Sequence, residues 1–239
     1  MRLAPFRLIL LPQRIMLFLV YAGMNYYVYH YFISPSSYIF KELSLITAII
    51  WSIISFMFLW SYIIVCWIDA GSTISLIKNI KPHEKEKYEF LTSEKLNKCE
   101  KCNLPKTERT HHCSKCNLCY YKFDHHCLII GNCIGFHNSQ AFVIFLVYGT
   151  LSWLFAGIIT FFSKSYYNGF NSTDSFVITL GFACLFICNF IFAKLSYEDY
   201  TQNRTAYDRV THRKYSVKRL KLKYPFPIYK ILPDLDERI

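Results

Sequence analysis

Four long runs of apolar residues divide the chain, with polar segments between them. The runs cover residues 15–33, 43–68, 141–162 and 175–193. An α-helix rises 1.5 Å per residue, so the shortest of these runs spans about 28 Å, close to the thickness of a bilayer's hydrocarbon core. The pattern predicts a membrane all-α protein with four transmembrane helices.

The first run has a rival interpretation as a cleaved signal peptide, because three arginines lie in the stub before it. The run is longer than the apolar region of a typical signal peptide, and no pair of small residues at cleavage-site spacing follows it. We therefore expect a retained first span.

The apolar runs set the expected organisation of the chain. Residues 1–14 form an N-terminal stub, 15–68 the first two helices, 69–140 a polar cysteine-rich domain, 141–193 the last two helices, and 194–239 a basic tail. The loops inside each helix pair are short. We expect the cysteine-rich domain to hold little regular secondary structure beyond short hairpins.

Positive charge is distributed unevenly among the polar segments. The stub carries three Lys or Arg residues, and the cysteine-rich domain and the tail carry eleven each, whereas each short loop carries one. Because cytosolic loops are enriched in Lys and Arg, both termini and the cysteine-rich domain are predicted to face the cytosol. The chain's 53% apolar residues and net charge of +11 fit a membrane protein whose basic flanks face anionic lipid. Basic residues placed in this way do not indicate nucleic-acid binding.

Seven of the ten cysteines and five of the eight histidines fall between Cys99 and Asn138. Cysteines two residues apart can reach one tetrahedral metal, and imidazole is the other favoured ligand of zinc. Disulfides are the alternative, but cytosolic thiols stay reduced. Two closed sites need eight ligands, which seven cysteines and one histidine supply, or six cysteines and two histidines with one cysteine spared.

A spared cysteine is of interest because of the run Asp124-His125-His126-Cys127. An adjacent imidazole can take a thiol proton, and a carboxylate can orient and stabilise that imidazole. This combination is typical of nucleophilic catalysis by cysteine. Ligand arithmetic alone leaves open which cysteine is spared.

The order of these residues resembles the DHHC family of protein S-acyltransferases, or palmitoyltransferases. Cys99-x2-Cys102 is followed by Pro105 and Arg109, and then by the core of the motif. That core reads His112-Cys113-x2-Cys116-x2-Cys119-x4-Asp124-His125-His126-Cys127-x5-Cys133, followed by Gly135-x2-Asn138-x3-Phe142. The resemblance covers roughly residues 10–210 and is strongest over residues 99–142.

The resemblance implies a role for each residue of the motif. It assigns one structural zinc to Cys99, Cys102, His112 and Cys119, and a second to Cys113, Cys116, His126 and Cys133. Cys127 is then the free nucleophile, His125 is the base, and Asp124 is the carboxylate that orients and stabilises the imidazole of His125. His111 has no role in this scheme, and we expect it to be a solvated loop residue.

Three segments depart from the family pattern. The usual Asp-Pro-Gly is Asp69-Ala70-Gly71, the usual Cys-Pro-Trp is Cys127-Leu128-Ile129, and the usual Thr-Thr-x-Glu is Thr205-Ala206-Tyr207-Asp208. We expect Ala206 to remove a hydroxyl contact near the catalytic site and Asp208 to shorten an acid. Loss of the tryptophan removes a large side chain close to the expected acyl channel.

The family's activity implies transfer of a long acyl chain, palmitoyl above all, from acyl-CoA to a protein cysteine through an acyl-enzyme on Cys127. The implied partners are membrane-associated proteins with cytosolic cysteines, acyl-CoA and the lipid bilayer, on an endomembrane (ER or Golgi) or at the plasma membrane.

The alternative function is a zinc-stabilised membrane adaptor with impaired catalysis, which the three departures from the family pattern support. A metal transporter is disfavoured, because the metal ligands lie outside the spans.

Overall fold

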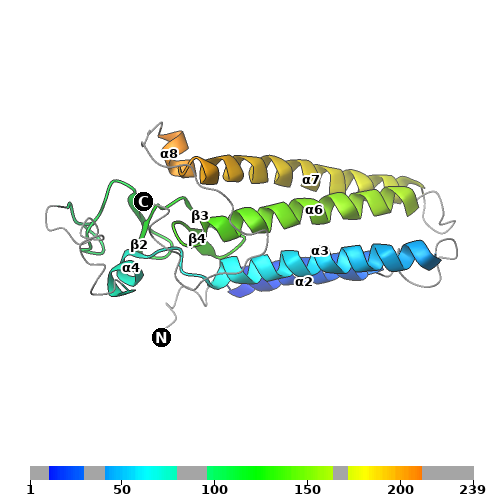
Figure 1. Cartoon of the computed structure of the whole chain (residues 1–239), viewed down its shortest axis with the longest axis horizontal. Helices are drawn as coiled ribbons and strands as arrows, with labels where there is room; N and C mark the ends of the chain where they lie inside the picture. Colours follow the sequence, from blue (N-terminus) through cyan, green and yellow to red (C-terminus); the bar gives the residue numbers. More distant parts are fainter. Residues whose placement is uncertain (1–10, 30–40, 80–95, 164–171, 212–239) are drawn as a thin grey trace.

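A computed structural model describes residues 11–29, 41–79, 96–163 and 172–211 (Figure 1). Its long helices are α2 (Leu11–Val28), α3 (Lys41–Trp67), α6 (Ser139–Ser163) and α7 (Ser172–Thr201). Short helices α4 (Thr73–Asn79) and α8 (Ala206–Val210) lie at one end of this bundle. The turn expected after the first span, the loop before the fourth and most of the tail lie outside the described residues.

Three of the described helices are long and apolar enough to cross a membrane. The spans are Leu45–Trp67, Ser139–Phe161 and Phe176–Thr201. Helix α2 is not among them; it begins at Leu11, before the expected start at residue 15, and so takes in Gln13 and Arg14. A fourth span therefore stays a prediction.

Helix α7 runs past the expected end of the fourth apolar run at residue 193. Its last turns carry polar residues, among them Asp199, which accepts hydrogen bonds from Arg204 and pairs with Arg209. The continuous apolar run ends at residue 193, whereas the helix, and the candidate span with it, continues to Thr201 because its polar end finds partners. The tail is consequently tied back to the end of α7.

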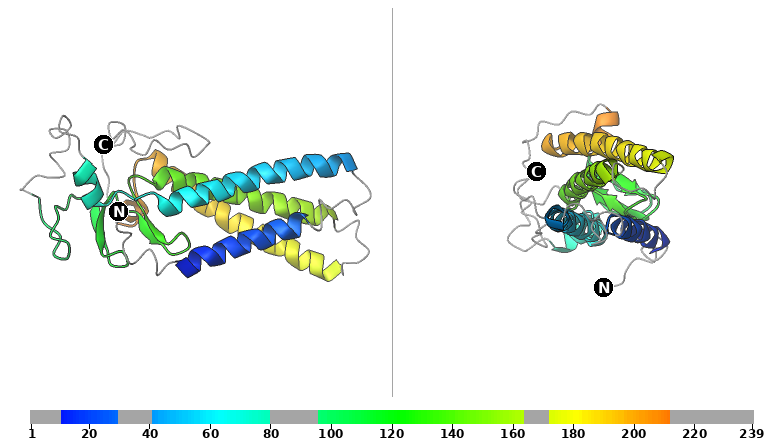
Figure 2. Two further views of the ribbon diagram at one scale, coloured as in Figure 1. Left: turned by 90° about the horizontal axis from the view of Figure 1, so that it is seen from below. Right: turned by 90° about the vertical axis from the view of Figure 1, so that its right-hand side faces the viewer.

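Helix α6 packs against both α3 and α7, as the views along and across the bundle show (Figure 2). Thr150 of α6 donates a hydrogen bond to Asn189 Oδ1 of α7 at 2.7 Å. Between α2 and α3, Asn25 Oδ1 accepts from the Trp51 indole at 3.0 Å and from Ser55. Polar groups inside a lipid-embedded bundle favour such interhelical partners. Asn189 is therefore an interhelical hydrogen-bonding group between α6 and α7.

The cysteine-rich domain, here residues 96–138, contains two antiparallel hairpins. Strands β1 (Thr110–Cys113) and β2 (Leu118–Tyr121) form the first, and β3 (His125–Cys127) and β4 (Asn132–Ile134) the second. The expectation of short hairpins agrees with this arrangement. Helix α4 precedes the domain, and Ser72 caps this helix by accepting the backbone N–H of Ser75 at 3.3 Å. Asp69 fixes the turn before the helix by accepting the backbone N–H groups of Gly71 and Ser72 at 2.8 and 2.7 Å.

Two asparagines connect this domain to the membrane helices. Asn132 Nδ2 donates to the carbonyls of Val65 and Ile68 at 3.1 and 2.8 Å, which satisfies carbonyls at the end of α3. Asn138 bonds Gly135 N and Cys133 O, and its own carbonyl accepts from Phe142 N in the first turn of α6. Helix α6 therefore starts from within the domain.

Gly135 lies where two backbone segments approach closely. A Cβ at this position would lie 2.6 Å from the carbonyl oxygen of Ala70 and 3.3 Å from that of Tyr121. Backbone atoms cannot move aside as the end of a flexible side chain can. The close approach requires glycine here.

We predict that Gly135→Ala lowers the free energy of unfolding by about 1–3 kcal/mol, because the added methyl forces the backbone near Ala70 to shift. Gly181→Ala is the matched control, since nothing lies within 4 Å of a Cβ there. Thermal unfolding of the purified protein in detergent compares the two. Equal melting temperatures for Gly135→Ala and wild type would contradict the packing argument.

Candidate active site and metal centres

The first cluster of metal-type donors brings together Cys99, Cys102, His112 and Cys119. Their donor atoms all lie within 4.8 Å of one another, and His112 Nδ1 is 3.0 Å from Cys102 Sγ and 3.7 Å from Cys99 Sγ. The chain turns tightly after Cys99, where Asn103 adopts a left-handed φ of 54°. The β1–β2 register then sets His112 opposite Cys119.

The second cluster brings together Cys113, Cys116, His126 and Cys133. His126 Nδ1 lies 3.4–3.6 Å from the three sulfurs, and the sulfurs of Cys116 and Cys133 are 3.5 Å apart. The β3–β4 register sets His126 opposite Cys133. Both groupings match the sets that the sequence analysis expects.

Strand β1 serves both clusters because its consecutive residues point to opposite faces. His112 points into the first cluster and Cys113 into the second. The two clusters therefore interleave along the chain and share strand β1.

The donor sets fit zinc. A tetrahedral zinc with bonds of about 2.3 Å to sulfur places its donors about 3.8 Å apart, which is close to the separations here. Three thiolates and one imidazole complete four-coordination, so no ligand position is left for a reacting water. All ten cysteines are free thiols, and none forms a disulfide.

The remaining motif residues form a group beside the second cluster. His125 and Cys127 are two residues apart on β3 and share one face of the strand, whereas His126 between them points to the metal donors. His125 Nδ1 lies 2.9 Å from Asp124 Oδ2, and the imidazole meets the Phe142 ring edge-on at 5.3 Å. The structure thus brings the three predicted catalytic side chains together.

Burial alone would lower the pKa of His125, but the hydrogen bond and negative charge of Asp124, together with Cys127, outweigh it and raise that pKa to about 9. The imidazole is thereby made more basic than an exposed histidine. Cys127 itself is half-buried and packs against the apolar cluster that includes Phe142, Phe145 and Ile130.

The segment after α7 supplies a partner for the second oxygen of Asp124. The backbone N–H of Ala206 donates to Asp124 Oδ1, and Asp124 N donates to Ile134 O at 2.9 Å. Asp124 is therefore fixed by groups from β4 and from α8 while its other oxygen faces His125. The contact at Ala206 uses the backbone and not a side chain.

Buried charges hold α8 against the cysteine-rich domain. Arg109 donates to Asp208 Oδ2 at 2.8 Å and to Asn203 O at 2.9 Å, and Lys122 Nζ donates to Asn203 Oδ1 at 2.9 Å. Thr205 and Asp208 also form a reciprocal capping box at the start of α8. Lys122 and Asn203 both adopt left-handed φ values. The sequence analysis missed Lys122 and Asn203, since a lone lysine and a lone asparagine carry no spacing signal.

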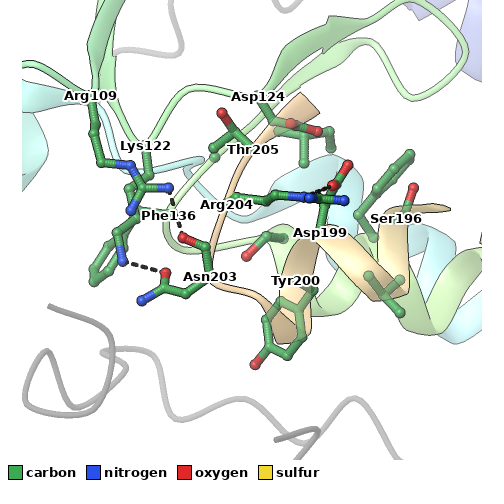
Figure 3. Close-up of a pocket in the computed structure, with 15 residues that line it drawn as sticks. Arg109, Lys122, Asp124, Phe136, Ser196, Asp199, Tyr200, Asn203, Arg204 and Thr205 are labelled. Atoms are coloured by element: carbon green, nitrogen blue, oxygen red, sulfur yellow. Dashed lines mark hydrogen bonds and ion pairs between the residues drawn. The ribbon is translucent and has the colours of Figure 1, made fainter. Parts of the chain in front are cut away.

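An open pocket with about 520 Å³ of empty space lies next to Asp124, between the domain and the ends of α6 and α7 (Figure 3). Its polar lining includes Arg109, Lys122 and Arg204, which are bonded to Asp208, Asn203 and Asp199 respectively. The pocket gives solvent access to the side of the site that carries Asp124.

The expectation for His111 was wrong. His111 lies within β1 and is half-buried, with its ring 4.0 Å from that of Tyr207 in α8 and 6.4 Å from that of Phe123. Motif spacing could not indicate this, because Tyr207 is almost a hundred residues away in the chain. His111 is part of the contact between the domain and α8.

We predict that the purified protein carries two zinc ions per chain and that Cys119→Ser, which removes one donor of the first cluster, lowers the content to one or fewer. Cys184→Ser is the control, because Cys184 lies exposed on α7 away from both clusters. Metal analysis by mass spectrometry measures both. An unchanged zinc content in Cys119→Ser would show that this cluster does not bind the metal.

Comparison with known proteins agrees with the geometry. No curated protein is similar enough to this chain to count as a match. The family model described as DHHC palmitoyltransferase matches residues 92–218, which include both clusters, the Asp124–Cys127 run and α8. With more than half of its length matched, this chain belongs to the DHHC palmitoyltransferase family.

Proposed function

We propose that this chain is a protein S-acyltransferase that moves a long acyl chain, palmitoyl above all, from acyl-CoA to a protein cysteine through an acyl-enzyme on Cys127. One observation carries the proposal. Cys127 belongs to neither Cys3His cluster, yet it shares a strand face with His125, whose Nδ1 is held by Asp124.

In the first step His125 accepts the proton of Cys127 through Nε2, because Nδ1 is engaged with Asp124. The Cys127 sulfur attacks the thioester carbonyl of acyl-CoA and the carbon–sulfur bond to coenzyme A breaks. The departing thiolate takes the proton from His125, which leaves a thioester on Cys127 and free coenzyme A.

In the second step a thiol of the protein substrate gives its proton to His125 and attacks the carbonyl of the acyl-enzyme. The bond between the acyl carbon and Cys127 breaks, and the Cys127 sulfur recovers the proton. Asp124 stabilises the positive charge on His125 in both steps. No proton is gained or lost over the cycle.

The two Cys3His sets would hold structural zinc, which supplies fixed geometry and not a reacting group. His126 is one donor of the second set, so fixing His126 also fixes the positions of its chain neighbours His125 and Cys127. Small displacements of reacting groups cost large factors in rate. The clusters therefore contribute to catalysis by holding β3 still.

The place of Cys127 suits a substrate with a long apolar tail. It packs against an apolar cluster to which α3 contributes Val65 and Cys66, and α6 contributes Phe142 and Phe145. An acyl chain leaving Cys127 in this direction enters the helix bundle and not water. Both chain ends and the cysteine-rich domain face the cytosol in this proposal, which the charge distribution supports.

The departures from the family pattern do not remove the contacts that the mechanism needs. Asp208 reaches Arg109 despite its shorter side chain, Ala206 supplies a backbone N–H to Asp124, and Ala70 is fully buried beside Gly135. These contacts favour an enzyme over an adaptor with impaired catalysis.

The function is tested with a clickable palmitoyl-CoA analogue and purified protein. We expect a hydroxylamine-labile label on wild type that Cys127→Ser abolishes and His125→Ala lowers at least tenfold, while all three proteins keep two zinc ions. A folded, zinc-loaded wild type that takes no label would identify the chain as the adaptor. Persistent labelling of Cys127→Ser would place the nucleophile elsewhere.

Ala206→Pro isolates the contribution of the Ala206 N–H to Asp124. Proline is tolerated at the first position of a helix, and Thr205 before it has the extended φ and ψ of −109° and 163° that proline requires of its neighbour. We predict that acylation slows by about 10–100-fold, because Asp124 loses a hydrogen bond that orients it. Ala206→Ser keeps the N–H and is expected to retain wild-type rate. Equal rates for the two variants would show that this N–H does not position Asp124.

A further inference from the structure

The tip of the β3–β4 hairpin exposes two consecutive aliphatic side chains. Leu128 is 56% exposed and Ile129 62%, whereas the next residue, Ile130, is fully buried in the apolar cluster beside Cys127. Gly131, with a φ of 64°, closes the turn through a 2.9 Å hydrogen bond from its N–H to Cys127 O. The turn is thus well formed, and it holds both side chains outward.

Exposed aliphatic side chains are rare elsewhere in the polar segment between α3 and α6. Between residues 69 and 138, among those that the structure describes, Ile74 on α4 is the other large apolar side chain that is exposed. Other exposed apolar side chains lie mainly on the long helices, where lipid covers them. The tip therefore resembles the lipid-facing helices and not the domain surface around it.

The tip also lies at the level of a helix end. Asn132, at the start of β4, bonds carbonyls in the last turn of α3, and Cys66 Sγ of α3 donates to Ile130 O at 3.3 Å. Helix α3 and its apolar span end at Trp67, which is 57% exposed, and tryptophan is enriched at membrane interfaces. The hairpin lies against this end of the bundle (Figures 1 and 2).

We infer that Leu128 and Ile129 insert into the lipid leaflet at its boundary between head groups and acyl chains. The hairpin tip then continues the lipid-facing surface of α3, to which hydrogen bonds attach it. Aliphatic side chains leave water for this boundary, and the peptide groups of the turn stay at the depth of polar head groups.

The insertion adds a membrane anchor directly beside Cys127. The strand that carries the nucleophile is held from one side by the second Cys3His cluster and from the other by lipid. The inference concerns where the tip lies, so it does not depend on acyl transfer and can be tested in an inactive variant.

The test measures the depth of the tip in a bilayer. A chain carrying Cys127→Ser, Cys184→Ser and Cys188→Ser leaves metal ligands and the buried Cys66 as its thiols. Ile129→Cys is added and labelled with the environment-sensitive dye NBD, and the zinc-loaded protein is placed in phosphatidylcholine vesicles with a nitroxide at carbon 5 of the lipid chain. Val210→Cys is the matched control, because Val210 is 74% exposed on α8.

We expect the dye at position 129 to be quenched at least twofold more than the dye at position 210 and to emit at shorter wavelength. Equal quenching at the two positions would overturn the inference. If Ile129→Cys loses zinc, the dye is placed through Leu128→Cys and the same comparison decides.

A second measurement uses the unlabelled chain with Cys127 intact. The double variant Leu128→Asn/Ile129→Asn is expected to keep two zinc ions and to lose at least tenfold in acylation rate in vesicles. Wild-type rate in a variant that also keeps its zinc would overturn the anchoring role of the two side chains in transfer, while the depth measurement decides whether the tip inserts.

Discussion

The convergence of eight donor side chains at two points is the constraint on which the cysteine-rich domain depends. Two separate two-stranded hairpins bury too little apolar surface to be stable alone in water. Here each hairpin contributes to a Cys3His set, and β1 contributes to both. Metal–ligand bonds can supply the free energy of folding that a small core does not.

The same alternation that distributes the ligands also places the reactive group. A strand of three residues offers one side chain to one face and two to the other. In β3 the middle residue, His126, faces the donors, so His125 and Cys127 face the opposite way. The strand therefore places a metal donor on one face and the predicted catalytic side chains on the other. Helix α8 adds two contacts to this arrangement: Ala206 N donates to Asp124, and Asp208 pairs with Arg109.

Patterns that are local in sequence predicted most of this structure. Apolar runs located the helices, because hydropathy is a property of neighbouring residues, and the resemblance to the family motif implied how the metal donors group. The end of α7 was predicted too early, since Asp199 is held by later residues that hydropathy does not register. His111 was placed wrongly, and Lys122 and Asn203 were missed, for the same reason: their partners lie some eighty to one hundred residues away. At Ala206 the sequence indicated only the loss of a side-chain hydroxyl, whereas the structure shows a backbone N–H that donates to Asp124, which a side-chain motif does not indicate.

The start of α6 inside the cysteine-rich domain has a consequence for the choice of target proteins. Asn138 belongs to both the domain and the first turn of the helix, and Asn132 ties the same domain to the end of α3. These hydrogen bonds attach the domain, and with it Cys127, directly to the ends of α3 and α6. For the acyltransferase proposed above, we expect the distance of a target cysteine from the membrane to be a condition for its modification, because Cys127 is held close to these helix ends.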